Sequence, residues 1–178
     1  MERSKIVILC LVTLLTGCVN TAYEAHDHEK MVKVENMMEI QNVISAYAMA
    51  WDKENTGEFA NHFTEEAIII DSWHKVETER FNGVQEFMDA RQSENGNVGG
   101  HSLSLVHFKK LDDKSASTEV VFNYFWYGNY ITSDATVNIR GSYIDEWVKT
   151  DSGWRIEKRI IEHENVPSHR AEQLGLTK

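Results

Sequence analysis

The stretch RGSYIDEWVKTDSGWRIEKR, Arg140–Arg159, indicates two neighbouring β-strands and the turn between them. Apolar and polar residues alternate over Thr136–Val148, around Gly141, and alternate again over Trp154–Glu162. Alternation of this kind is typical of strands with one buried face. The turn residues Thr150–Gly153 lie between the two runs, so the sequence predicts an antiparallel pair towards the C-terminus.

The sequence before this pair predicts further strands. Thr118–Ile131 is rich in β-branched and aromatic residues, and His101–Lys109 alternates in part. Ala67–Asp71 is a short apolar run of the kind found in buried strands. Glu94–Gly100, which contains three glycines, is expected to be a loop.

Helices are predicted in the first half of the chain. Two short ones are expected at Gly57–Phe63 and after the Asn82–Gly83 turn. The longest is expected at Lys30–Asp52, where apolar residues recur three or four positions apart: Val34, Met37, Ile40, Ile44, Tyr47 and Trp51. Helices followed by a run of antiparallel strands define an α+β domain.

We expect the strands to form a strongly curved antiparallel sheet with the helices over one face. Gly128 and Gly141, within long strands, permit the bends that such curvature requires. The open end of such a curved sheet can hold a ligand. An interior filled with side chains would give the same sequence pattern, and periodicity alone does not separate the two.

The first 17 residues have the features of a bacterial lipoprotein signal peptide. Arg3 and Lys5 precede an apolar run, Ile6–Leu15, that is shorter than the roughly 20 residues needed to cross a bilayer. The run ends in Leu-Thr-Gly-Cys, which resembles a lipobox and would place the lipid on Cys18. A plain signal peptide and a short uncleaved anchor are the alternatives. The expected division is a signal at 1–17, a polar tether at 18–29, a folded domain at 30–166 and a tail at 167–178.

This signal predicts a protein of the cell envelope that meets the membrane through its lipid anchor alone. Val19 follows the cysteine, which in a Gram-negative cell favours the outer membrane, facing the periplasm. The chain has 18 basic and 28 acidic residues, which disfavours nucleic acid as a partner. Cys10 would leave with the signal and Cys18 would carry lipid, so no thiol remains for a disulfide, a nucleophile or a metal ligand.

Three segments resemble the SnoaL-like branch of the nuclear transport factor 2-like superfamily: WDKENTGEFANHFTEEA at Trp51–Ala67, FNGVQEF at Phe81–Phe87, and the last strand pair. The most recognisable part is the Gly-x-Tyr-x-Asp of Gly141–Asp145 with the GWRI of Gly153–Ile156. It marks a fold rather than an activity. The resemblance covers about Glu35–Glu162 and implies a cone, or cystatin-like roll: a curved antiparallel sheet on three helices, with a pocket inside.

Two lyases of that branch, hexachlorocyclohexane dehydrochlorinase and bile acid 7α-dehydratase, imply which residues would act. Both have an aspartate at the end of the first helix and a histidine at the start of a middle strand, matched here by Asp52 and His101. The arginine of the dehydrochlorinase is matched by Arg159, and the tyrosine of the dehydratase by Tyr47. The dehydrochlorinase has lysine at that last position, so the resemblance implies a dehydratase-like arrangement.

These four residue types suit proton transfer without a metal or an organic cofactor. A neutral histidine accepts a proton near neutral pH, and a carboxylate on its far nitrogen fixes the tautomer. Arginine and tyrosine can then stabilise or protonate a leaving group. Each residue also has a structural alternative: Asp52 as an exposed helix-end charge, His101 as a loop-edge residue, Arg159 on a solvated strand face, and Tyr47 in the core.

A cavity in this fold is expected to bind a small apolar molecule, aromatic or polycyclic, against aromatic walls. The strand at Thr118–Ile131 offers one aromatic set on each face, and the sequence does not decide which set lines the cavity. His107 is expected on the strand face of His101. No metal site is predicted, because His26 and His28 in a flexible tether make too weak a pair. The candidate ligand-binding residues are Trp51, Tyr124, Trp126 and His107.

The sequence therefore predicts an exported SnoaL-like protein that acts as a cofactor-independent lyase or isomerase. The alternative is a non-catalytic ligand-binding or protein-interaction module on the same fold. A homodimer formed through the outer face of the sheet is also expected.

Overall fold

The computed structural model describes residues 3–92, 99–126 and 137–165. The chain forms two compact units, 1–38 and 39–178, and helix α1 (Arg3–Asp52) contains residues of both. The first unit is helical from Arg3 onward, so residues 18–29, expected to be an irregular tether, belong to the helix. No glycine or proline interrupts the sequence between Gly17 and Gly57, so no residue in this stretch has the strong helix-breaking chemistry. None of the described helices is long and apolar enough to cross a membrane.

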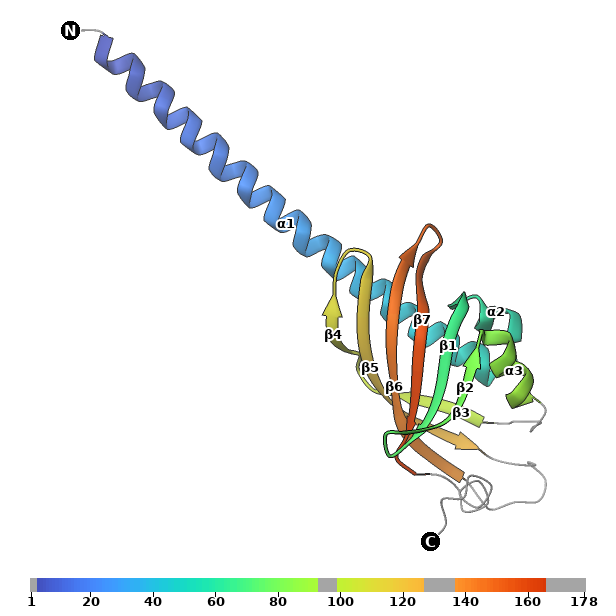
Figure 1. Cartoon of the computed structure of the whole chain (residues 1–178). Coiled ribbons are helices and arrows are strands. Elements are labelled where there is room, and N and C mark those ends of the chain that lie inside the picture. The colour runs from blue at the N-terminus through green and yellow to red at the C-terminus, as the bar shows by residue number, and fades with distance from the viewer. Residues whose placement is uncertain (1–2, 93–98, 127–136, 166–178) are drawn as a thin grey trace. The chain divides into compact units, whose positions relative to one another are not determined.

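The second unit contains the last turns of α1, two short helices and seven strands (Figure 1). Asn55 caps the first short helix by accepting a hydrogen bond from the backbone N–H of Glu58 at 3.3 Å. In chain order after α1, the elements are α2 (Thr56–Ala60), β1 (Phe63–Trp73), β2 (Val76–Asn82), α3 (Val84–Gln92), β3 (Gly99–Leu103), β4 (His107–Leu111), β5 (Ser115–Trp126), β6 (Val137–Thr150) and β7 (Gly153–His163).

The strands form one sheet in the order β2-β1-β7-β6-β5-β3, with β4 also paired to β5. The stretch Arg140–Arg159 forms the predicted hairpin, in which Asp145 pairs with Arg159 and Thr150 with Gly153. The sheet is mixed rather than wholly antiparallel, because β1 pairs with β7 in parallel. Sequence analysis did not predict β2, whose charged residues, VETERFN, hide the strand pattern.

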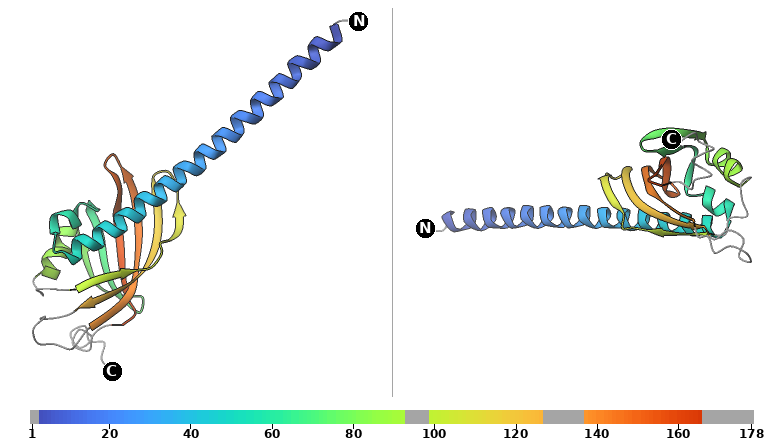
Figure 2. Two further views of the ribbon diagram at one scale, coloured as in Figure 1. Left: turned by 180° about the vertical axis from the view of Figure 1, so that it is seen from behind. Right: turned by 90° about the horizontal axis from the view of Figure 1, so that it is seen from below.

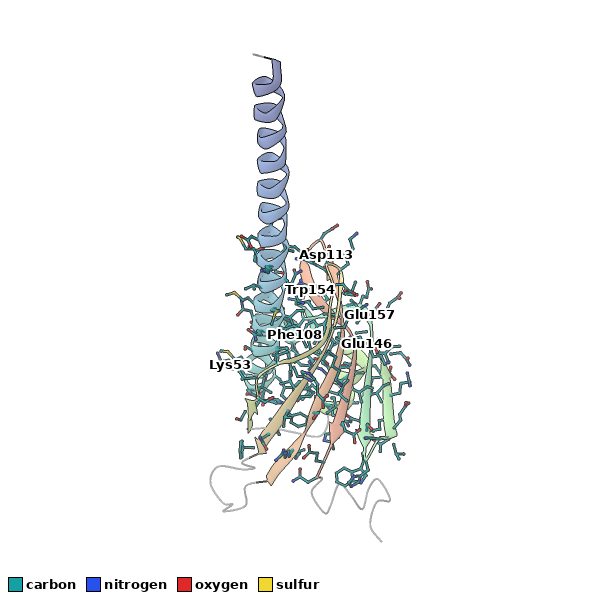
Figure 3. The ribbon with its side chains drawn as sticks, turned by 90° about the vertical axis from the view of Figure 1, so that its left-hand side faces the viewer. Lys53, Phe108, Asp113, Glu146, Trp154 and Glu157 are labelled. Carbon is teal, nitrogen blue, oxygen red and sulfur yellow. The ribbon has the colours of Figure 1, made fainter. Side chains whose placement is uncertain are left out.

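The sheet is strongly curved, and α2 and α3 lie at its edge formed by β1 and β2 (Figure 2). Its two faces differ in composition. Trp154 lies on the side of the strands that faces the helix, whereas Glu146 and Glu157 lie on the opposite side (Figure 3). Trp154 is 1% exposed, and both glutamates are exposed to solvent. The apolar side chains of alternate strand residues therefore form a core on the inner face.

The core joins the last turns of α1 to that inner face. Ile40, Ile44 and Tyr47, predicted to share a helix face, are all at most 2% exposed. On β5 the buried face carries Thr118, Val120 and Phe122, so this is the face that packs inward. Trp147 donates a hydrogen bond from its indole N–H to the Thr118 hydroxyl at 2.9 Å, which satisfies two buried polar groups.

Candidate active site

The predicted aspartate and histidine meet where α1 ends beside β3. Asp52 is the last residue of α1, and His101 is the third residue of β3, 49 positions later in the chain. The Asp52 carboxylate accepts a hydrogen bond from the His101 backbone N–H at 2.9 Å. Its other oxygen lies 2.6 Å from His101 Nδ1. One carboxylate thus holds both the backbone and the ring of the same histidine.

This contact determines the tautomer of His101. A carboxylate accepts hydrogen bonds, so Nδ1 carries the proton and Nε2 presents a lone pair. Nε2 lies 2.8 Å from the hydroxyl oxygen of Tyr143 on β6. The hydroxyl therefore donates to Nε2, and the three residues form a continuous chain from phenol to imidazole to carboxylate. The His101 side chain is 6% exposed and that of Asp52 is 23% exposed.

Tyr143 packs closely against its neighbours. Its ring stacks on Phe122 with centroids 4.3 Å apart, and the Arg159 guanidinium lies 4.3 Å from the ring centroid. Burial raises the pKa of the Tyr143 phenol well above its usual value, although the charge of Arg159 opposes this. Gly141 permits the stacking, because a Cβ at this position would lie 2.8 Å from the Phe122 ring. Sequence analysis had read Tyr143 only as a marker of the fold.

Arg159 lies near this chain, but its charge is already neutralised. It forms two parallel hydrogen bonds with Asp145, both 2.7 Å long, and the two side chains are 3% and 0% exposed. Burial tends to lower the pKa of Arg159, but the neighbouring Asp145 carboxylate raises it above its usual value. The guanidinium lies between the rings of Tyr47 and Tyr143, at 4.0 and 4.3 Å from their centroids. Arg159 therefore reaches His101 only through Tyr143.

Tyr47 lies in the core, as its structural alternative anticipated. It is 1% exposed, and its ring packs edge-on against Tyr143 with centroids 5.8 Å apart. Burial raises the pKa of its phenol, while Arg159 acts in the opposite direction. Its hydroxyl forms no hydrogen bond of ordinary geometry with the residues that the structure describes.

One of the predicted ligand-binding residues, Tyr124, lies beside the histidine, and a second, Trp51, directly precedes Asp52 on α1. The Tyr124 ring lies 4.8 Å from the His101 ring. Burial, with the negative charge of Asp52, raises the pKa of Tyr124 to about 12. The Trp51 ring continues the aromatic surface towards Phe59 and Phe87, with centroids 5.0 and 5.5 Å away.

The structure does not place His107 beside His101. His101 pairs with Tyr124 on β5, whereas His107 pairs with Glu119, five residues away and therefore on the opposite face. His107 is also exposed. The strand breaks between Leu103 and His107, so the alternation that placed both histidines on one face does not continue across the break. The side chains of Trp126 and Cys18 lie outside the described residues.

A second polar cluster, which sequence analysis missed, lies on the same inner face. Asp71 on β1 forms an ion pair with Arg91 on α3, and Arg91 also bonds Glu79 on β2 at 2.7 Å. His163 Nε2 at the end of β7 lies 3.6 Å from the Asp71 carboxylate. Burial alone would raise the pKa of Asp71, but the nearby His163 ring and the charge of Arg91 lower it. No three of the described acidic, histidine or cysteine residues form a metal-binding group.

The fold defines the class: an α+β domain whose helices pack on a strongly curved mixed sheet. The model of the SnoaL-like domain family matches residues 32–160, so the chain belongs to this family. Its structural neighbours lie in the nuclear transport factor 2-like superfamily. None of the curated proteins is significantly similar to the chain.

Solved structures share the fold at low sequence identity. A proposed scytalone dehydratase of Novosphingobium aromaticivorans is 16% identical, with a TM-score of 0.66 over 76% of this chain and 89% of that chain. LinA is 13% identical, with a TM-score of 0.62 over 76% and 90%. The β subunit of benzoate 1,2-dioxygenase from Burkholderia mallei is 12% identical, with a TM-score of 0.60 over 71% and 89%. These similarities show the fold alone.

Proposed function

We propose that this protein is a cofactor-independent lyase or isomerase that removes a proton from a carbon next to a carbonyl group. The observation that carries the proposal is the Asp52 carboxylate 2.6 Å from His101 Nδ1, with its second oxygen on the His101 backbone. This clamp orients the ring, fixes the tautomer and stabilises the imidazolium ion that forms when Nε2 takes a proton.

Tyr143 gives the proton its path. Its hydroxyl donates to Nε2 at 2.8 Å, so the phenol oxygen takes the substrate proton while its own proton passes to His101. The raised pKa of Tyr143 disfavours a free phenolate, so the proposal couples the two transfers in one step. The carbon–hydrogen electron pair becomes an enolate, from which loss of a β-substituent gives an elimination and return of the proton elsewhere gives an isomerisation.

The sequence supports an exported lipoprotein as the setting for this chemistry. Cys18 would be the lipidated residue, with the domain in the cell envelope. A Cys18→Ser variant that still incorporates labelled palmitate in growing cells would contradict this assignment. The proposed ligand is a small, largely apolar ring compound, because the rings of Tyr124 and Phe122 lie beside the histidine.

The decisive experiment measures proton exchange, which needs no knowledge of the leaving group. The full-length chain is incubated with 2-decalone in D₂O, and loss of the protons beside the carbonyl is followed by NMR. Replacing an essential general base lowers such a rate by roughly 10²–10⁴-fold, which is expected for His101→Ala. His107→Ala is the matched control, because His107 is exposed on the opposite face of the sheet and is expected to keep the wild-type rate.

A wild type that exchanges no faster than His101→Ala would contradict the catalytic proposal. A second function would then stand: a ligand-binding module without catalysis. One observation favours it specifically: Nε2 of His101 is already occupied by the Tyr143 hydroxyl, so the ring has no free acceptor for a substrate proton. Ligand binding that persists in His101→Ala without exchange would support this alternative.

A further inference from the structure

The second polar cluster has an unused hydrogen-bonding atom. His163 Nε2 lies 3.6 Å from the Asp71 carboxylate, which favours the neutral tautomer with its proton on Nε2 and with Nδ1 as an acceptor. Nδ1 is buried and has no hydrogen-bond partner among the described residues. A buried polar atom without a partner is costly and uncommon in native proteins, and a bound ligand is one of its ordinary explanations.

The ring of His163 is held in place from several sides. Asp71 is fixed by the Arg91 guanidinium on one side, and its lowered pKa keeps it charged, so a negative charge faces Nε2. On the other side the His163 ring meets Phe122 edge-on, with centroids 6.1 Å apart and an interplanar angle of 90°. Nδ1 is therefore the acceptor of an oriented ring rather than of a freely rotating side chain.

Phe122 relates this cluster to the candidate active site. The His101 ring also contacts Phe122, with centroids 6.3 Å apart. The pairing of β5, β6 and β7 places His163 opposite Gly141, and Gly141 opposite Phe122. The two histidines thus lie on the same face of the sheet with one aromatic ring between them. A ligand that contacts both must be longer than one ring.

We propose that His163 is a second, substrate-recognising site, which accepts a hydrogen bond from a hydroxyl group at the far end of a two-ring or longer ketone. The inference rests on the proposed function, because it assigns the carbonyl end of the same ligand to Tyr143 and His101. It makes His163 a specificity-determining residue with no part in the proton transfer. Asp71 and Arg91 are its positioning residues.

The test compares two ketones that differ only at the far ring, 2-decalone and 6-hydroxy-2-decalone. Deuterium exchange by the full-length wild type is expected to show a lower KM for the hydroxylated ketone. Loss of one hydrogen bond corresponds to roughly a two- to tenfold change in affinity. His163→Leu is therefore expected to raise the KM for 6-hydroxy-2-decalone by that factor, with kcat and the KM for 2-decalone unchanged. His163→Gln keeps an acceptor oxygen and is expected to restore part of the preference.

Three results would overturn this inference while leaving the proposed function intact: a wild type without preference, a His163→Leu variant that keeps the preference, and a variant that loses both ketones equally. The last result would assign His163 a structural role. If neither ketone is exchanged, the proposed function fails instead, and equilibrium binding of the same two ketones then decides the inference by the same comparison.

Discussion

Two acid–base pairs meet at Tyr143, and they differ in how completely their charges are satisfied. The Arg159–Asp145 pair is at most 3% exposed, and both oxygens of the carboxylate accept from the guanidinium. The Asp52–His101 pair is partly open, with Asp52 23% exposed, and His101 keeps a nitrogen whose partner is a hydroxyl group that can move its proton. The Arg159–Asp145 pair, whose charges are fully paired, stabilises the fold. The Asp52–His101 pair, which keeps a nitrogen bonded to a hydroxyl group, can transfer a proton.

The contacts of Arg159 give it a different role from the one that the family resemblance implies. An arginine that stabilises a leaving group has to point its donors at the substrate. Here two donors are engaged by Asp145, and the guanidinium plane lies between two tyrosine rings. Its effect on the site is therefore indirect, through the position and the pKa of Tyr143.

The largest expected effect comes from breaking the saturated pair. Asp145→Asn leaves a buried arginine charge uncompensated, which costs about 3–5 kcal/mol of unfolding free energy. Urea unfolding followed by circular dichroism measures this change. Glu146→Gln is the matched control, because Glu146 is the next residue, is exposed and pairs with Lys158 at the surface. Such surface pairs contribute about 0–1 kcal/mol. Equal losses of unfolding free energy in the two variants would show that the Arg159–Asp145 pair stabilises the fold no more than a surface pair does.

A smaller effect is expected at Asp71, whose partner Arg91 retains a second carboxylate, Glu79. Asp71→Asn is expected to cost about 1.5–3 kcal/mol at neutral pH, the range for hydrogen bonds to charged groups. The folded-state pKa of Asp71 lies below the unfolded value of 3.8. Its contribution is therefore present above pH 3.8 and is lost as the pH falls through the folded-state pKa.

Unfolding measured across the acid range tests this sign. The difference in stability between wild type and Asp71→Asn is expected to shrink as the solution is acidified. Asp151→Asn, in the exposed turn before β7, is the control and is expected to follow the wild type throughout. A difference that grows on acidification would show that Asp71 is protonated in the folded protein.

The sequence predicted features that depend on local pattern. The helix face of Ile40, Ile44 and Tyr47 and the final hairpin followed from periodicity, and the structure confirms both. The parallel pairing of β1 with β7 was not predicted, because it joins residues about 90 positions apart and leaves no local signal. The contact between Asp52 and His101 was anticipated only through the family resemblance, since spacing alone does not place a helix end beside a strand.

The site residues that the sequence did not reveal lie in ordinary alternating strands. Gly141, Tyr143 and Asp145 alternate on one strand face, so their shared inward direction was readable, but their partners were not. Tyr143 gains its role from His101, and Asp145 from Arg159. The cluster at His163 leaves no local signal in the sequence, because its partner Asp71 lies on another strand. A polar residue on an alternating strand indicates a site only when its partner is known.

The smallest expected effect on stability, and the sharpest test of the comparison, comes from Tyr143→Phe. The substitution keeps the ring that stacks on Phe122 and lies beside Arg159, and it removes only the hydroxyl on His101 Nε2. One hydrogen bond contributes about 0.5–1.5 kcal/mol, so the fold is expected to survive. Exchange of 2-decalone is nevertheless expected to fall nearly as far as in His101→Ala, because the proton path is broken. Wild-type exchange in Tyr143→Phe would show that His101 takes the substrate proton directly, and would leave Tyr143 a structural link between the two pairs.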